Sequence, residues 1–322
     1  MGRWIAGRLA QGLLTAAVAA ALVFFLMRAA PGDPLARLSE DRQLTPEQAA
    51  VLRERYGLDT PAGAQFAAFI GGLVRGDLGT SIEHGRPVTA LLAERLPASL
   101  LLGGTVLLLT FGLGAWLGAW QAIRRGAADR ALGAAALVLY ATPSFWLALV
   151  LAWLVGVEWR LLPAAGMRDP FLPADAGAGE RLVDIARHLV LPALTLAAVN
   201  IAATMRYQRS AMLEALAQPY VGAARARGIA ERRVHWRHGW RNALFPVVTL
   251  FGLWLPLLVA GSVFVEKIFA WPGLGALAAD AVAARDYPLL MGASLLVTGL
   301  VVAGSLLADV AYAALDPRVR RP

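Results

Sequence analysis

The chain has 322 residues, of which 58% are hydrophobic and only 16% charged, and its mean hydropathy is +0.58. This apolar excess excludes an ordinary soluble domain of this length. The absence of cysteine excludes disulfides, thiolate metal sites and thiol catalysis, and the net charge of +8 must be located along the chain before it is interpreted.

Six stretches are long and apolar enough to cross about 30 Å of hydrocarbon as α-helices. We therefore predict an all-α integral membrane protein with six membrane-spanning helices, at residues 9–27, 100–123, 131–157, 189–205, 243–265 and 287–308. The first stretch could also be a secretory signal, but it is longer than the apolar region of a usual signal, and Arg28-Ala29-Ala30 is a poor cleavage site. We expect it to stay attached.

The basic charge is confined to alternate connections. The segment before the first span, residues 124–130 and 206–241, and the segment after Asp309 together carry +12, whereas the other three connections together carry −3. Because positive charge is retained on the cytoplasmic side, we predict that both termini are cytoplasmic and that the three acidic connections lie outside. The charge therefore reflects membrane topology, and no nucleic-acid partner is expected.

The first external connection, residues 28–99, is too long for a simple turn. Helical patterns cover residues 45–57 and 62–74, and Thr45-Pro46-Glu47-Gln48 is a strong helix start with Thr as the N-cap. We predict a small folded cap outside the membrane. The second external connection is rich in proline and glycine, and we expect an irregular loop followed by a short amphipathic piece.

The internal connection 206–241 contains a short helix framed by Pro219 and Gly228. Proline suits the first position of a helix and glycine suits its end, so the frame predicts a helix of about nine residues. Small residues would leave Tyr220 and Val221 as its protruding apolar features, a surface suited to a partner's groove. The pattern equally allows a basic helix that lies on anionic headgroups.

Several kinds of chemistry are missing from the sequence. No phosphate-binding loop is present, and the single lysine, Lys267, is followed by isoleucine. His235 and His238 are three residues apart but have no further ligands nearby, so we expect no metal site there. The spans contain no carboxylate except Asp309 at the end of the sixth, for which we expect an interfacial or ion-pairing role.

The spans do contain kinks and small polar groups. Thr142-Pro143-Ser144 should kink the third span, and polar side chains follow in the fourth and fifth. Such groups either hold helices together or line a wet path, and spacing does not separate the two roles. Our candidates for a translocation path are Ser144, Asn200, Thr204 and Thr249.

Ordered motifs from end to end give the chain a family resemblance. They include Ala30-Pro31-Gly32-Asp33-Pro34, Gly76-Asp77-Leu78-Gly79-Thr80-Ser81, Leu162-Pro163-Ala164-Ala165-Gly166, the loop 220–228, Arg241-Asn242-Ala243-Leu244-Phe245-Pro246, Phe269-Ala270-Trp271-Pro272-Gly273, Arg285-Asp286-Tyr287-Pro288 and Leu315-Asp316-Pro317-Arg318. The chain resembles the inner-membrane permease subunit of ABC importers for dipeptides, oligopeptides, glutathione and nickel.

The resemblance implies that the short internal helix is a coupling helix that docks into a separate ATPase subunit. Its residues would be Tyr220, Val221, Gly222, Ala223, Ala224, Arg225, Ala226, Arg227 and Gly228. The chain departs from the family at two points: Gly222 stands where the general loop begins with Glu, and Arg227 stands where the peptide branch commonly has Lys.

The resemblance also implies an organisation and a set of partners. Residues 1–27 would form the cytoplasmic N-terminus and first span, 28–99 the external cap, and 100–322 the permease core. Partners would be a second homologous permease, two ATPases, an extracytoplasmic solute-binding protein and the lipid of a bacterial inner membrane. The chain would hold no cofactor, because ATP and Mg²⁺ would bind to the ATPases, and it would not be an enzyme.

Two other classes of protein are weaker candidates. A secondary transporter would need ionisable residues or broken repeat pairs inside the spans, and an intramembrane enzyme would need a nucleophile or metal set there.

On the outer face, we expect residues 28–99 and 269–287 to dock the binding protein, although Phe269 and Trp271 could equally pack against the spans. The solute itself is not identified by this sequence.

Overall fold

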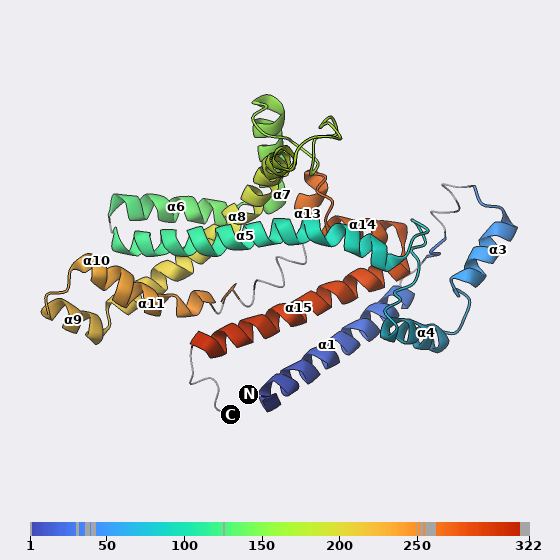
Figure 1. Cartoon of the computed structure of the whole chain (residues 1–322), viewed down its shortest axis with the longest axis horizontal. Helices are drawn as coiled ribbons and strands as arrows, with labels where there is room; N and C mark the ends of the chain where they lie inside the picture. The colour runs from blue at the N-terminus through green and yellow to red at the C-terminus, as the bar shows by residue number, and fades with distance from the viewer. Residues whose placement is uncertain are drawn as a thin grey trace. The chain divides into compact units, whose positions relative to one another are not determined.

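The computed structural model describes residues 2–29, 32–35, 39, 43–124, 126–248, 250–251, 254 and 262–315. These residues form helices joined by turns and loops, with a single isolated bridge between Thr80 and Pro87 (Figure 1). The chain divides into two compact units, one made of residues 1–99 and 272–306 and the other of residues 100–271 and 307–322. Each unit is described by itself.

The first unit is built around an antiparallel helix pair, α1 (Gly2–Ala29) and α15 (Tyr287–Leu315). The two helices run side by side in opposite directions (Figure 1), and Gly12 lies so close to Val302 that a Cβ at position 12 would overlap that side chain. The N-terminal half of α1 therefore packs against the part of α15 around Val302.

Among the described residues, this unit also contains three further helices and the start of α5 (Val88–Ile123). The cap contains α3 (Pro46–Arg55) and α4 (Ala62–Val74), and α14 (Leu274–Ala284) precedes α15. The predicted cap helices are confirmed, including the capping box between Thr45 and Gln48. A buried apolar cluster joins the first turns of α5 to α14 and α15, with Val88, Leu92, Leu274, Leu277 and Leu289 among its members.

The second unit contains the rest of α5, α6 (Ala127–Ala141), α7 (Ser144–Leu151), the π-helix η1 (Ala152–Glu158) and the long helix α8 (Ala178–Leu216). α5 packs closely on α8 through Gly114 and Gly118: a Cβ at Gly118 would lie 2.3 Å from the Met205 carbonyl oxygen. Small residues four apart are a common way to bring membrane helices together.

Four shorter elements follow α8 in this unit: α9 (Pro219–Ala226), α10 (Glu231–Arg233), η2 (Val234–Gly239) and α11 (Trp240–Ala243). The helix α13 (Val263–Ile268) follows later in the chain.

Four of the predicted spans are confirmed as helices long and apolar enough to cross a membrane: Gly7–Ala29, Val88–Ile123, Ala178–Leu216 and Tyr287–Leu307. The predicted fourth span was too short, because the expected amphipathic piece and the span form one 39-residue helix. The kink predicted in the third span is confirmed, and a single crossing by the two bent helices stays a prediction. α6 and the following helix Ser144–Glu158 are bent by 100° at Thr142-Pro143, where proline breaks the hydrogen-bond ladder.

Ten of the 23 residues of the fifth predicted span, residues 243–265, lie outside the described residues, and Thr249 is one of them. The side chain of Asp309 is also outside them. The total of six crossings therefore stays a prediction, of which the structure accounts for four single helices and one bent pair.

Candidate functional site

The short helix α9 has the frame that the sequence predicted. Gln218 is extended at the N-cap, and Pro219 occupies the first turn, where its missing N–H is not needed. At the other end Gly228 has φ +75, a left-handed conformation that disfavours residues with a Cβ. The Gly228 N–H donates to the Arg225 carbonyl oxygen at 2.9 Å, and the Ile229 N–H donates to that of Ala224 at 3.3 Å. These two bonds form a Schellman motif, which gives the helix a sharp end.

The inner face of α9 is a small apolar contact. Val221 and Ala224 are both fully buried and pack with Val234 of η2, while Leu216 and Ile229 cover the edges of this cluster. The spacing of three residues puts Val221 and Ala224 on one side of the helix. The prediction that Val221 protrudes is therefore wrong: with Tyr220 and small residues on the outside, Val221 is the one large apolar side chain that can anchor the helix.

Polar contacts fix the position of α9 against the segments that follow. The Arg225 guanidinium donates to both carboxylate oxygens of Glu231, at 2.7 and 3.2 Å, and the His235 imidazole lies 3.1 Å from the same carboxylate. The hydrogen bond from Arg225 lowers the pKa of Glu231, and the same bond raises the pKa of Arg225. Farther along, Asn242 donates to the Tyr220 hydroxyl at 2.8 Å.

The outer face of α9 and its C-terminal end combine small side chains with one aromatic ring and two arginines. Its exposed residues are Tyr220, Gly222, Ala223, Arg225, Ala226 and Arg227. A Cβ added at Gly222 would meet nothing within 4 Å, so the helix backbone is open to close approach there. Beside it lies a wide basic concavity of ≈ 800 Å³, lined by Trp116, Ala230, Arg232, Arg233, Trp236, Arg237 and Arg241. The whole surface is shaped for a partner that brings acidic groups and shallow apolar contacts.

The candidate path residues are only partly brought together. Thr204 is 3% exposed and packs against Gly114 of α5, which favours its role in holding helices together. The Asn200 amide donates to the Leu196 carbonyl oxygen within α8 at 2.8 Å, and Ser144 is half-buried at the start of α7. The roles of Ser144, Asn200 and Thr204 in a path stay predictions.

The described residues contain no cluster of three or more histidine or acidic side chains able to hold a metal ion. His235 pairs with Glu231, so its proximity to His238 in sequence does not create a shared site.

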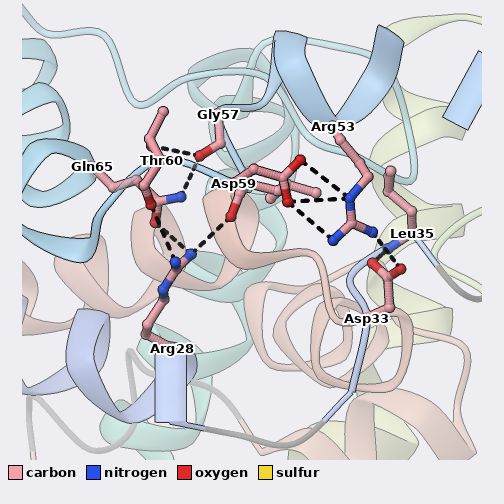
Figure 2. Close-up of polar contacts among 9 residues, drawn as sticks. Arg28, Asp33, Leu35, Arg53, Gly57, Asp59, Thr60 and Gln65 are labelled. Atoms are coloured by element: carbon pink, nitrogen blue, oxygen red, sulfur yellow. Dashed lines mark hydrogen bonds and ion pairs between the residues drawn. The ribbon is translucent and has the colours of Figure 1, made fainter. Parts of the chain in front are cut away.

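The cap of the first unit is held by arginines whose partners are far away in sequence. Arg28, the penultimate residue of α1, donates to the carbonyl oxygens of Leu58 and Thr60 at 3.1 and 3.2 Å and to the Gln65 side chain at 2.9 Å (Figure 2). Arg53 connects two acids in the same view, Asp33 at 2.7 Å and Asp59 at 3.2 Å. These contacts tie α1 to the segment between α3 and α4.

A buried carboxylate, which the sequence analysis did not single out, forms the other anchor of the cap. Asp286 caps the start of α15 by accepting from the Leu289 N–H at 3.2 Å, and it also accepts from the Ser81 hydroxyl and from the Glu83 N–H. Asp286 and Ser81 are both fully buried. One signal was available: both residues belong to motifs that carry the family resemblance, which makes a contact between the motifs a reasonable expectation.

A third motif reaches the same region, because Gly32 (φ +118) lies against the Arg285 guanidinium so closely that a Cβ would overlap it. The motifs around Gly32, Ser81 and Asp286 therefore converge in one unit and specify the attachment of the cap.

Of the two roles left open for Phe269 and Trp271, packing is confirmed and an exposed contact surface is not. Each is only 1% exposed, and Phe269 packs with Ala148, Leu191 and Val265 of its own unit. The Phe269 carbonyl oxygen also accepts from the Gly166 N–H at 2.7 Å. The two rings are structural, which is the alternative that the sequence had left open.

Two family models cover almost the whole chain. The model described as "Binding-protein-dependent transport system inner membrane component" matches residues 111–321, and the one described as "Binding-prot-dependent transport system membrane comp, N-term" matches residues 1–103. The boundary between the two matches falls within α5.

Relatives of similar length carry peptide-transport names. The oligopeptide transport system permease protein AppB of Bacillus subtilis is 40% identical over 300 residues, which cover 92% of this chain and 93% of the relative. The dipeptide transport system permease protein DppB of Escherichia coli K12 is 35% identical over 315 residues, 93% of each chain. The oligopeptide transport system permease protein OppB of Mycobacterium bovis is 39% identical over 334 residues, 99% of each chain.

Proposed function

Because this chain belongs to the inner membrane components of binding-protein-dependent transport systems and is a permease subunit of a peptide importer, we propose that α9 is the element that couples it to a separate ATPase. The single observation that carries this proposal is the construction of α9. Val221 and Ala224 anchor one face, a Schellman motif ends the helix, and small residues are exposed on the other face.

The chemistry of the exposed face supports docking. A short helix with small outward residues lets the backbone of a partner approach closely, and Tyr220 provides an aromatic anchor of the kind enriched at protein interfaces. Arg225 is already paired with Glu231, so Arg227 and the neighbouring arginines are the cations available to acidic groups on the ATPase. ATP and Mg²⁺ would bind to the ATPase, whose hydrolysis would move α9 together with the permease.

The remaining parts of the proposed machine follow the family. A second homologous permease would complete the translocation path, and an extracytoplasmic binding protein would deliver the peptide to the cap. We propose cytoplasmic termini and a cytoplasmic α9 from the distribution of charge. Cysteine accessibility labelling would test this orientation: a reporter at Gln48 should react from outside intact cells, and one at Ala217 should not.

The coupling role is tested by blocking the exposed face. We expect Ala223→Glu to leave insertion unchanged but to abolish co-purification of the ATPase, because the new carboxylate occupies the centre of the outward surface. The matched control is Ala128→Glu, which makes the same change at an exposed position of the other basic connection. Equal ATPase recovery with both variants would rule out α9 as the docking element.

A further inference from the structure

A second polar cavity lies between α5, α6 and α8, and no residue of α9 lines it. Its volume is ≈ 390 Å³, and its lining is Gln121, Asp129, Arg130, Gly133, Arg206, Arg209 and Ser210. All of these residues belong to the second unit.

The cavity carries an excess of positive charge. Arg209 donates to both oxygens of Asp129, at 2.8 and 2.7 Å, so this pair is fixed and its charges cancel. Arg130 and Arg206 have no carboxylate partner within the described part of the chain. The Arg206 guanidinium lies 5.8 Å from the centre of the Tyr140 ring, which holds it at the edge of the cavity. Two cations thus face the same space, as required for binding an anion.

One wall of the cavity is closed by Gln121. This residue is 2% exposed, and its amide nitrogen donates to the Asp129 carbonyl oxygen at 2.8 Å. Its oxygen Oε1 has almost no accessible surface, so a ligand in the cavity does not reach it. The groups that a ligand would meet are the two arginines.

The surroundings of the cavity point to lipid. Arg130, Gly133, Leu137 and Tyr140 are spaced three and four residues apart, so they form one stripe along α6. Leu137 and Tyr140 are 56% and 54% exposed, and the stripe runs from a basic end to an apolar, aromatic one. A neighbouring cavity of ≈ 290 Å³ shares Arg206 and Ser210 with this polar cavity and is also lined by Tyr140, Ala203 and Tyr207.

These residues lie where a bilayer interface is expected. The apolar run of α5 ends at Ile123, immediately before Arg124, and that of α6 begins after Arg130. Arginine and tyrosine at the ends of apolar helices are typical of the headgroup level, and basic pockets between such helices suit anionic headgroups.

We propose that this cavity binds an anionic phospholipid. Arg130 and Arg206 contact its phosphate, and an acyl chain follows the exposed stripe of α6. A free anion would use the arginines but not the apolar stripe. The site is separate from α9 and does not depend on its coupling role.

Native mass spectrometry of the intact complex in detergent tests this proposal, with phosphatidylglycerol, phosphatidic acid and phosphatidylcholine added in turn. We expect phosphatidylglycerol and phosphatidic acid to be retained well, because both carry a net negative charge, and phosphatidylcholine least, because its choline group cancels the charge of its phosphate. Arg130→Gln and Arg206→Gln should each lower phosphatidylglycerol retention about fivefold, the contribution typical of one basic residue at a membrane surface. Arg206→Lys should keep most of the retention and thereby separate lost charge from misfolding.

The matched control is Arg124→Gln, which removes an exposed arginine of the same connection that does not line the cavity. Its phosphatidylglycerol retention should equal that of the unmodified complex. Equal losses in Arg124→Gln and Arg206→Gln would overturn the site, and so would equal retention of phosphatidylglycerol and phosphatidylcholine. Displacement of the lipid by millimolar dipeptide or inorganic phosphate would assign the cavity to a soluble anion and overturn the proposal as well.

Discussion

The helix α9 and the cap are both polar segments outside the predicted spans, but they are held in place in different ways. The polar contacts of α9 join residues 6 and 22 positions apart. Those of the cap join residues 30, 32, 37 and 205 positions apart. α9 is thus specified by nearby backbone signals, whereas the cap depends on residues from both ends of the chain. Local disruption should affect coupling through α9, and loss of one distant partner should loosen the cap.

The largest effect is expected from Asp286→Ala in the anchor of the cap. The substitution leaves the Ser81 hydroxyl and two backbone N–H groups without their buried acceptor. We expect a loss of about 3 kcal/mol in stability, because each such group costs about 1–3 kcal/mol. Thermal unfolding of the purified protein in detergent measures this loss. Asp175→Ala removes an exposed carboxylate as a control, and an equal melting temperature for the two variants would contradict the anchoring role of Asp286.

A smaller effect on stability but a large one on coupling is expected from Gly228→Pro. Proline cannot adopt φ +75, and it lacks the N–H that donates to Arg225, so the Schellman end of α9 is lost. ATPase co-purification should fall sharply while the amount of inserted protein is unchanged. Gly76→Pro is the matched control, since it makes the same change at the end of α4, where Gly76 has φ +76 and its N–H donates to the Leu73 carbonyl oxygen. If both variants bind the ATPase equally well, the geometry of the helix end is not needed for docking.

Arg28→Ala should loosen the cap without unfolding it. It removes hydrogen bonds to Leu58, Thr60 and Gln65 at an exposed position, where a loss of about 1–2 kcal/mol is expected. Limited proteolysis should cut the segment between α3 and α4 faster than in the unmodified protein. The control is Arg55→Ala, which removes another exposed arginine of the cap and should be cleaved at the rate of the unmodified protein. Faster cleavage in both variants would show that charge, not the contacts of Arg28, protects the segment.

The smallest effect is expected from the ion pair of α9. Arg225→Glu places two carboxylates together and should weaken ATPase binding, and adding Glu231→Arg should restore it because the pair is re-formed in reverse. If the double variant does not regain ATPase binding, Arg225 contacts the ATPase directly.

The same pair fixes the expected dependence on pH. The pKa of Glu231 is lowered below its ordinary value of 4.5, so the contribution of the pair is complete above that value and is lost only as pH falls through the lower folded pKa. ATPase binding should therefore show no change due to Glu231 between about pH 6 and 8. Binding assays with the unmodified chain and with Glu231→Gln across this range check this expectation.

Much of the local structure could be predicted because its signals lie within a few residues. Thr45-Pro46 starts α3, Pro219 and Gly228 frame α9, and Thr142-Pro143 interrupts the third apolar stretch. Each result follows from capping or from the geometry of proline and glycine, which need no tertiary information. The apolar runs likewise identified four membrane-crossing helices from length and composition alone.

Burial was decided by the tertiary structure. Val221, Phe269 and Trp271 were each expected to be exposed or left open, and all three are buried. Sequence patterns show that a side chain is apolar, but the surface that covers it comes from distant elements, such as η2 for Val221 and α7 for Phe269. The same holds for polar anchors: Asp286 is one acid among many in the sequence, and only folding brings it to Ser81, 205 residues away.

The sequence by itself determined the helices and the family, because these depend on local geometry and on the order of motifs. Only the tertiary structure decided which side of α9 is exposed and which residues hold the cap, because burial and long-range hydrogen bonds exist only once separate segments meet.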